Sequence, residues 1–259
     1  MKTMREPYKI VDAEGVYLYT EDQKLIDSVS SWWCMIHGYK HPELTAAIKE
    51  QADRFCHVML GGLTHEPVQK LSEKLHTFLP GDLDYCFFSD SGSVAVEVSL
   101  KMALQYNINL GRKRPMVLAL EHAYHGDTFK AMEVGDDDHH ALMHGPTFMG
   151  NALACSVALK GIEIFEREDY MGKIRRIEEI SHREMDGFSD PRVKEVRIMG
   201  GCTCIEVYDS KTLEGFLQFA YERGVFSRLF LKYMYSMVPY VIKEEELVKI
   251  FDTMKQWFA

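Results

Sequence analysis

The sequence has no long hydrophobic run. Purely apolar stretches such as "MVLAL" at residues 116–120 are far shorter than the ~20 residues that a membrane-spanning helix needs. The opening residues, "MKTMREPYKI", carry charges and lack the apolar segment of a secretory leader. We therefore expect a cytoplasmic protein with no membrane partner.

Positive charge is also scarce. The chain has 30 Lys and Arg against 39 Asp and Glu, which gives a net charge of −9 at pH 7. Such a surface repels a polyanion overall, and the compact basic run "GRKRP" at 111–115 is typical of a solvated loop. The sequence predicts no nucleic-acid partner.

Cysteines are few and scattered. Of the six, the close pair Cys202 and Cys204 lacks the two-residue gap of zinc or redox motifs. The run "DDDHH" at 136–140, with His144 nearby, resembles a set of metal ligands. Consecutive acids and histidines in a loop usually remain solvated, however, because a closed site needs convergent ligands with hydrogen-bonded support. We predict reduced thiols and no metal site.

The patterns that are present are those of an α/β protein. Two alternating segments around Thr20–Asp22 predict a β-hairpin. Apolar residues at helical spacing predict one helix from Pro42 and another over Thr64–Leu79.

A predicted strand, Tyr85–Phe88, then turns through Ser89–Ser93 into an almost wholly apolar helix. The polar positions of that helix form one narrow stripe, so the sequence predicts that its other faces are buried. A second apolar strand, "MVLALE" at 116–121, ends at the polar cluster "HAYHGDTF". Alternation of strand, polar loop and helix is typical of an open sheet with a site at its carboxyl edge.

After residue 150 the pattern changes to a separate α+β lobe. Helices are expected over 151–169 and 170–182, followed by a hairpin around Gly200–Gly201. A further helix is capped by Gly224, and a last one runs over 243–258.

Two clusters could bind a phosphorylated, planar ligand. Ser91, Gly92 and Ser93 lie where a strand becomes a helix, so backbone N–H groups and hydroxyls converge on an anion site. The alternative is that the serines only cap the helix. Tyr124 and His125 follow the next strand, where an aromatic ring could stack on a ligand or simply pack in the core.

Other residues could bind a substrate. Trp32 and Trp33 suit the wall of an apolar channel, although adjacent tryptophans can equally be packing residues. Arg228 lies in an otherwise apolar strand and needs an anionic partner there. A substrate carboxylate or a structural salt bridge would serve.

Several strings together resemble one family. They are "SSWWCMIHGYKHPEL", "HVMLGGLTHEP", "SDSGSVAVEVSLKMALQY", "YHGDTF", "MHGPTFMGNALAC" and "GVFSRLFLKYMYSMVPYVI". The family is that of the adenosylmethionine-8-amino-7-oxononanoate aminotransferases of biotin synthesis, class III members of the fold-type-I pyridoxal-phosphate enzymes. The resemblance implies an α/β fold with a truncated large-domain sheet and an α+β C-terminal small domain. Its expected divisions are 1–57 (first segment of the small domain), 58–150 (truncated cofactor-binding domain) and 151–259 (small domain).

The resemblance also implies a role for each matching residue. Gly92 and Ser93 would hold the phosphate of pyridoxal 5'-phosphate, and Tyr124 would stack on its ring. Thr147 would reach the phosphate bound by the other subunit of a homodimer. The expected substrate-binding residues are Trp32, Trp33, Gly145, Arg228 and Tyr235. The implied reaction transfers an amino group from S-adenosylmethionine to 7-keto-8-aminopelargonate and gives 7,8-diaminopelargonate.

One part of the family pattern is absent. Between "YHGDTF" and "MHGPT" the family continues through much of its large domain, whereas this chain has only a short connection. The lysine that binds the cofactor covalently and the aspartate that pairs with its ring nitrogen are lost with that segment. Lys130 would approach from the phosphate side and is a poor substitute. We therefore assign no catalytic residue and expect no covalent attachment.

The missing segment has a structural consequence too. A two-stranded sheet is marginal unless something covers it, and an uncovered apolar helix favours association. The sequence thus leaves two hypotheses: an aminotransferase chain that still binds the cofactor, or a catalytically inactive remnant that acts only as a dimerising or interaction chain.

Overall fold

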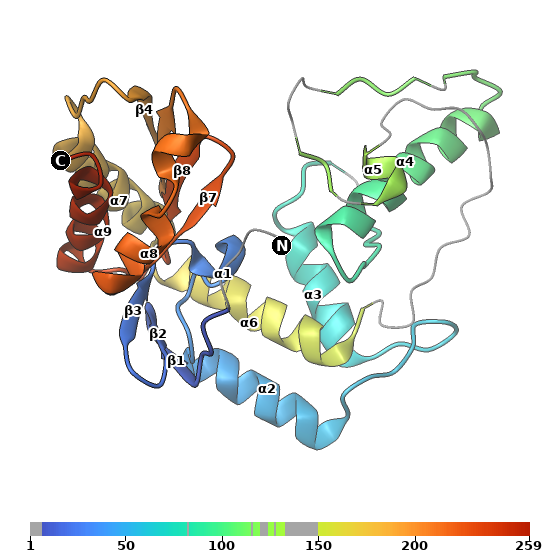
Figure 1. The fold of residues 1–259 in the computed structure, drawn as a ribbon. Coiled ribbons are helices and arrows are strands. Elements are labelled where there is room, and N and C mark those ends of the chain that lie inside the picture. The colour runs from blue at the N-terminus through green and yellow to red at the C-terminus, as the bar shows by residue number, and fades with distance from the viewer. Residues whose placement is uncertain (1–6, 82, 115, 120–123, 127, 133–149) are drawn as a thin grey trace. The chain divides into compact units, whose positions relative to one another are not determined.

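In a computed structural model of the chain, residues 7–259 are described except 82, 115, 120–123, 127 and 133–149. They form two compact units (Figure 1). Unit 1 comprises Met1–Thr45 and Gly161–Ala259, and unit 2 comprises Ala46–Lys160. The divisions at residues 57 and 150 expected from the resemblance stay a prediction.

The first sheet of unit 1 joins the two ends of the sequence. Its strands are β1 (Asp12–Glu14), β2 (Tyr17–Tyr19), β3 (Lys24–Asp27) and β6 (Val225–Phe226), in the order β1-β2-β3-β6. The predicted hairpin is confirmed, since β2 and β3 pair antiparallel with Tyr17 opposite Ile26. β3 also pairs with β6, in parallel, which places residues near 27 beside residues near 226.

The second sheet of unit 1 is antiparallel, in the order β4-β5-β8-β7. Its strands are β4 (Val193–Met199), β5 (Cys202–Val207), β7 (Arg228–Phe230) and β8 (Tyr233–Met237). The hairpin around Gly200–Gly201 is confirmed, with Met199 opposite Cys202. Gly200 has φ +55°, the left-handed conformation that a two-residue hairpin turn requires.

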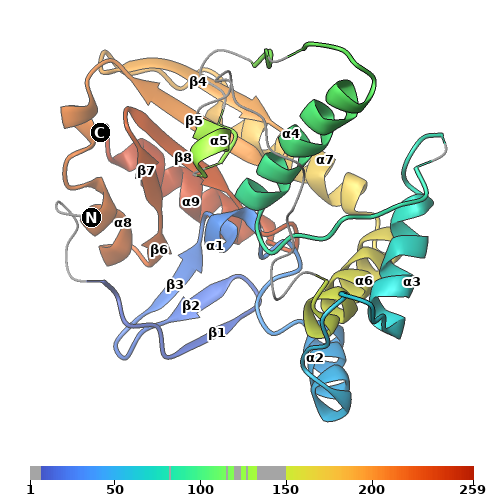
Figure 2. The ribbon, with the colours of Figure 1, turned by 90° about the vertical axis from the view of Figure 1, so that its right-hand side faces the viewer.

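Helices cover this second sheet. α7 (Tyr170–Met185) and α9 (Glu244–Gln256) lie side by side against it (Figures 1 and 2). A short helical turn over Ser210–Leu213 and helix α8 (Phe216–Glu222) follow β5 in the chain. The buried core of unit 1 is built from Ile177, Ile205, Met234, Leu247 and Phe251, among others. The helices and strands predicted for the C-terminal part are present because their apolar residues pack against one another in this core.

Unit 2 is helical in its described part. Helix α2 (Pro42–Arg54) enters it from unit 1 and helix α6 (Ala152–Arg167) leaves it, while α3 (Glu66–His76), α4 (Gly92–Asn109) and α5 (Phe129–Met132) lie within it. His65 caps α3 by accepting the Val68 N–H at Nδ1, and its Nε2 lies 2.9 Å from the Gly150 carbonyl oxygen. This contact joins α3 to the start of α6. No described helix is both long and apolar enough to cross a membrane.

Three expectations for unit 2 are wrong. The described residues of the two predicted strands, 85–88 and 116–119, belong to no strand. Tyr85 is 96% exposed and Leu118 fully exposed. Nor are the apolar faces of α4 buried: Val98 is the fully buried residue of this helix, whereas Tyr106 is 62% exposed. A strand forms only against a neighbouring strand. The described residues of unit 2 are also too few to cover the apolar helix.

Candidate cofactor and substrate sites

The N-terminus of α4 forms a candidate anion site in unit 2. Ser91 is the N-cap, and its hydroxyl accepts the Val94 N–H at 3.3 Å. The capping role considered for the serines therefore holds for Ser91. Gly92 follows with open space where a side chain would begin, so an anion can approach the first-turn N–H groups and the positive end of the helix dipole.

A loop around Gly126 closes one side of this helix end. Gly126 has φ +122°, and a Cβ built on it would lie 2.7 Å from Ser93 Oγ and 2.8 Å from Ser93 Cα. Only glycine permits so close an approach. Gly126 was not among the predicted site residues, although it stands within the string "YHGDTF".

Polar atoms beside this loop lack partners. Nε2 of His125 and Oγ1 of Thr128 are buried without a hydrogen bond among the described residues. Buried polar groups normally have partners, so the loop can offer two more polar atoms to an anion. Tyr124, at the start of the same loop, is 73% exposed and can present its ring. These residues fit the phosphate and the ring face of a pyridoxal phosphate.

A left-handed turn in unit 1 carries the two tryptophans. In α1 (Ser30–Trp33) all four residues have positive φ, between 47° and 71°. Non-glycine residues adopt this conformation at a cost of about 1–3 kcal/mol each. The turn therefore persists only because its surroundings hold it.

Asp27 is the main support of that turn. It is fully buried at the end of β3, and its carboxylate accepts the N–H of Val29 at 2.9 Å and that of Ser31 at 2.8 Å. The Tyr39 hydroxyl donates to the same carboxylate at 2.5 Å, and burial together with Asp27 raises the pKa of Tyr39. Ser30 Oγ ties the turn to β8 by donating to the Met237 carbonyl oxygen at 2.7 Å.

The four described residues that were predicted for the substrate site come together on this support. Arg228 and Tyr235 are cross-strand partners in β7 and β8. The Arg228 guanidinium lies 5.1 Å from the centre of the Trp32 ring, and the Trp33 and Tyr235 rings form a T-shaped pair with centres 6.4 Å apart. Burial raises the pKa of Tyr235, so its hydroxyl stays neutral at physiological pH. A cation set among aromatic rings suits a carboxylate on an apolar molecule.

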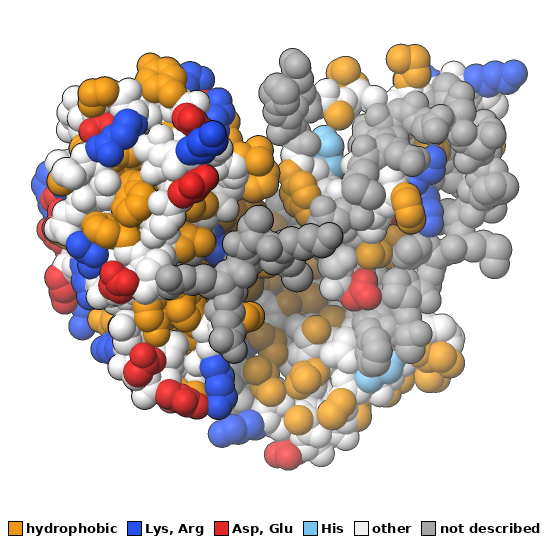
Figure 3. Space-filling model, in the orientation of Figure 1, with side chains coloured by type: hydrophobic (Ala, Val, Ile, Leu, Met, Phe, Trp, Pro, Cys, Tyr) orange, Lys and Arg blue, Asp and Glu red, His pale blue; other side chains and the backbone are white. Residues whose placement is uncertain are grey.

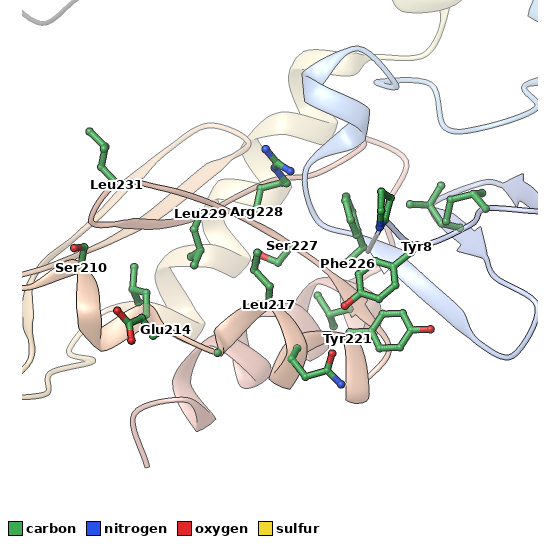
Figure 4. Close-up of a pocket in the computed structure, with 17 residues that line it drawn as sticks. Tyr8, Ser210, Glu214, Leu217, Tyr221, Phe226, Ser227, Arg228, Leu229 and Leu231 are labelled. Atoms are coloured by element: carbon green, nitrogen blue, oxygen red, sulfur yellow. The ribbon is translucent and has the colours of Figure 1, made fainter. Parts of the chain in front are cut away.

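A cavity of about 670 Å³ extends from Arg228 within unit 1. Its volume is in the range of small-molecule sites. Leu217, Leu229 and Phe226 give it apolar walls, and Tyr8 stacks on Tyr221 at one end with ring centres 4.1 Å apart (Figure 4). The Arg228 side chain points away from Leu217 in this view.

Several predicted residues cannot be placed. Gly145, Thr147 and the run "DDDHH" lie outside the described residues. Gly92, Ser93 and Tyr124 belong to unit 2, whereas Trp32, Trp33, Arg228 and Tyr235 belong to unit 1. Each group is therefore a local arrangement of its own unit.

The structure also brings together a cluster of possible metal ligands that are distant in sequence. Ligand atoms of His41, Glu43 and Glu168 lie within 4.8 Å of one another. Arg167 donates to both carboxylates, and Lys173 donates to Glu168 at 2.9 Å. Because these cations already neutralise the acids, the arrangement is that of an ion-pair network.

The fold is that of the pyridoxal-phosphate transaminases of fold type I. A solved adenosylmethionine-8-amino-7-oxononanoate aminotransferase from Methanocaldococcus jannaschii superposes with a TM-score of 0.89 at 21% identity, covering 99% of this chain and 97% of that chain. An omega transaminase from Pseudomonas jessenii gives a TM-score of 0.87 at 15% identity, covering 97% and 92%.

The chain belongs to the class III aminotransferase family, whose model matches residues 2–143 and 137–258. A relative from Buchnera aphidicola (strain APS), an adenosylmethionine-8-amino-7-oxononanoate aminotransferase, is 27% identical over 387 positions that cover 94% of this chain and 90% of the relative. One from Synechococcus elongatus with the same name is 47% identical over 137 residues, covering 52% of this chain and 32% of the relative. The family implies pyridoxal phosphate as the cofactor.

These matches also show the internal gap. This chain has 259 residues, so at least 128 of the 387 positions aligned with the Buchnera relative have none of its residues opposite them. The family match divides at residues 137–143. The predicted loss of a large internal segment is thereby confirmed.

Proposed function

We propose that this chain binds the components of one reaction, the transfer of an amino group from S-adenosylmethionine to 7-keto-8-aminopelargonate. The names of the aminotransferase relatives support the reaction class. The observation that carries the proposal is the cluster of Arg228, Trp32, Trp33 and Tyr235 in unit 1. A cytoplasmic location and a homodimer that uses Thr147 remain predictions.

Arg228 has the clearest role in substrate binding. Its guanidinium would form two parallel hydrogen bonds to the carboxylate of 7-keto-8-aminopelargonate. Trp32 and Trp33 would exclude water from that ion pair and pack against the aliphatic chain. The hydrogen bonds of Asp27 position the tryptophans before the substrate arrives.

The helix end in unit 2 has the complementary role. Its first-turn N–H groups, Ser93 and the polar atoms of the 124–128 loop would hold the cofactor phosphate, while the Tyr124 ring would lie against the pyridine. Bound pyridoxal phosphate supplies an electron sink for amino transfer. The residues present would orient such a ring and hold its phosphate at the end of the helix.

The chain would not complete the reaction alone. By resemblance, the lysine that attaches the cofactor and moves the proton belongs to the missing segment, together with the aspartate that pairs with the ring nitrogen. Lys130 lies in α5, directly after the loop that approaches the phosphate end, and we do not assign it that role.

The test is a titration of the full chain with pyridoxal phosphate, followed by borohydride reduction and peptide mapping. We expect saturable binding, which inorganic phosphate competes away, with no reduced adduct at one defined lysine. Saturable binding of 7-keto-8-aminopelargonate that Arg228→Ala weakens about tenfold or more is the second expected result. Absence of both binding events would overturn the proposal. A stoichiometric lysine adduct would overturn the inference that the chain lacks a lysine that attaches the cofactor.

A second candidate function is that of an interaction chain without catalysis. It is favoured by the number of exposed apolar residues on α4, because a concentration of exposed apolar side chains marks interaction sites. Binding of neither cofactor nor substrate, together with a stable assembly, would favour this candidate.

A further inference from the structure

Unit 2 exposes an apolar surface that we name the α4 face. It consists of the exposed apolar residues of helix α4 and its C-cap, and of the two segments 83–88 and 116–119, which have no regular secondary structure. Its large exposed apolar side chains are Leu83, Tyr85, Phe87, Met102, Tyr106, Ile108, Leu110, Met116 and Leu118. Hydrophobic side chains reach the surface over unit 2 in the view of Figure 3.

The exposure is too extensive to be incidental. Single exposed apolar residues are common, but here 18 helical residues include one fully buried side chain, Val98. A helix in a protein derives most of its stability from burying an apolar face. The α4 face therefore has the composition of a surface made to be covered.

The two segments and one side-chain oxygen of α4 point to the same conclusion. Segments 83–88 and 116–119 are rich in aromatic and aliphatic residues typical of strands, yet neither is in a strand. On α4 itself, Oε2 of Glu97 is buried without a hydrogen-bond partner among the described residues. A covering element would have to add strands beside the two segments and a donor near Glu97.

The sequence comparison identifies what is missing at this place. At least 128 positions of the Buchnera relative have no counterpart here, and the family match divides at 137–143, soon after 116–119 and α5. Elements close in sequence are usually neighbours in space. A second copy of this chain lacks the same positions and cannot supply them.

We propose that the α4 face is the docking site for a separate polypeptide that carries the segment missing at residues 137–143. This partner adds strands next to 83–88 and 116–119 and packs helices on α4. In restoring the sheet it also brings a lysine and a ring-pairing aspartate, a consequence that rests on the proposed function. The assembly would then be a transaminase made of two kinds of chain.

The experiment is co-expression of the tagged full chain with the part of the Buchnera relative that faces the gap, made as an untagged polypeptide. We expect that polypeptide to co-purify in equal molar amount and to slow amide hydrogen exchange at 83–88, 116–119 and α4. No co-purification would overturn the proposal. So would assembly of the chain with itself that protects the same residues and excludes the added polypeptide.

A variant and a matched control test the surface. Met102→Gln places a polar group on the exposed α4 face, and Met199→Gln makes the same change at an exposed methionine in β4 of unit 1. We expect Met102→Gln to lower the recovered partner severalfold and Met199→Gln to leave it unchanged. Equal recovery with both variants would contradict docking on α4.

The assembly test separates this inference from the proposed function. Co-purification and exchange protection require no cofactor and no turnover. A complex that forms without binding pyridoxal phosphate would overturn the proposed function and keep the interface. A chain that binds both ligands but no partner would overturn the interface and keep the proposed function.

Discussion

At the residue scale, one buried carboxylate supports the cluster of Trp32, Trp33, Arg228 and Tyr235. Asp27 accepts two backbone N–H groups of the left-handed turn and the Tyr39 hydroxyl. Those bonds offset the unfavourable φ angles of Ser31 and Trp32. Trp32 reaches Arg228 because Asp27 holds the turn.

Asp27→Asn should therefore loosen the turn. An amide group replaces one acceptor oxygen by a donor, so at least one of the three hydrogen bonds is lost and a buried group remains unpaired. We expect a loss of about 1–3 kcal/mol in the free energy of unfolding and a red shift of tryptophan emission in the folded protein. Urea unfolding followed by fluorescence measures both.

Glu21→Gln is the control for Asp27→Asn, because Glu21 is an exposed acid paired with Lys9. It should change stability by no more than about 0.5 kcal/mol. Asp27→Asn with the unfolding curve and emission of the unaltered chain would show that the turn does not depend on the carboxylate.

Individual residues show what the sequence could predict. The resemblance named Arg228, Trp32, Trp33 and Tyr235, and the structure brings them together. Asp27 was missed because the turn that it holds contains no glycine, and no local pattern marks four non-glycine residues with positive φ. Gly126 was missed because its requirement comes from Ser93, which is distant in sequence.

At the element scale, local information was sufficient for hairpins and helices but not for the second sheet. β2–β3 and β4–β5 form around short turns between adjacent segments. The strands predicted at 85–88 and 116–121 have residues typical of strands, but their described residues, 85–88 and 116–119, have no neighbouring strand within the described chain. The burial predicted for α4 is wrong for the same reason, because the described residues include no segment that covers this helix.

The contact between the Gly126 loop and α4 allows an element-level prediction. Gly126→Ala would place a methyl group within 2.9 Å of three Ser93 atoms, so the loop must move away from the helix end. We expect the affinity for pyridoxal phosphate to fall about tenfold, which corresponds to about 1.4 kcal/mol. Absorbance titration at constant ionic strength measures the change.

Gly187→Ala is the matched control for Gly126→Ala. Gly187 also has positive φ (+78°), but a Cβ there meets nothing within 4 Å. Both substitutions carry the backbone cost of a positive φ, whereas only Gly126→Ala creates a clash at the candidate phosphate site. Equal affinities for the two variants would remove the Gly126 loop from that site.

For the whole molecule, the distribution of buried residues predicts two levels of stability. The hydrophobic core of unit 1 joins both sheets to α7, α8 and α9. In unit 2 the buried apolar side chains described are few: Pro67, Val68, Leu71, Val98, Ala131, Ala152 and Cys155. Local opening follows buried contact density, so unit 2 should open well below the free energy at which unit 1 unfolds.

Hydrogen exchange by mass spectrometry tests that difference directly. Amides of β5, β8 and α9 should exchange slowest, while those of α3 and α4 should exchange at least about a hundredfold faster, a gap of about 2.7 kcal/mol. Limited proteolysis should cut first between 83 and 119 and leave the two parts of unit 1, up to Thr45 and from Gly161, associated through the β3–β6 pairing. Equal protection of α4 and α9 in the isolated monomer would mean that unit 2 is already fully covered, and would remove the need for a partner on the α4 face.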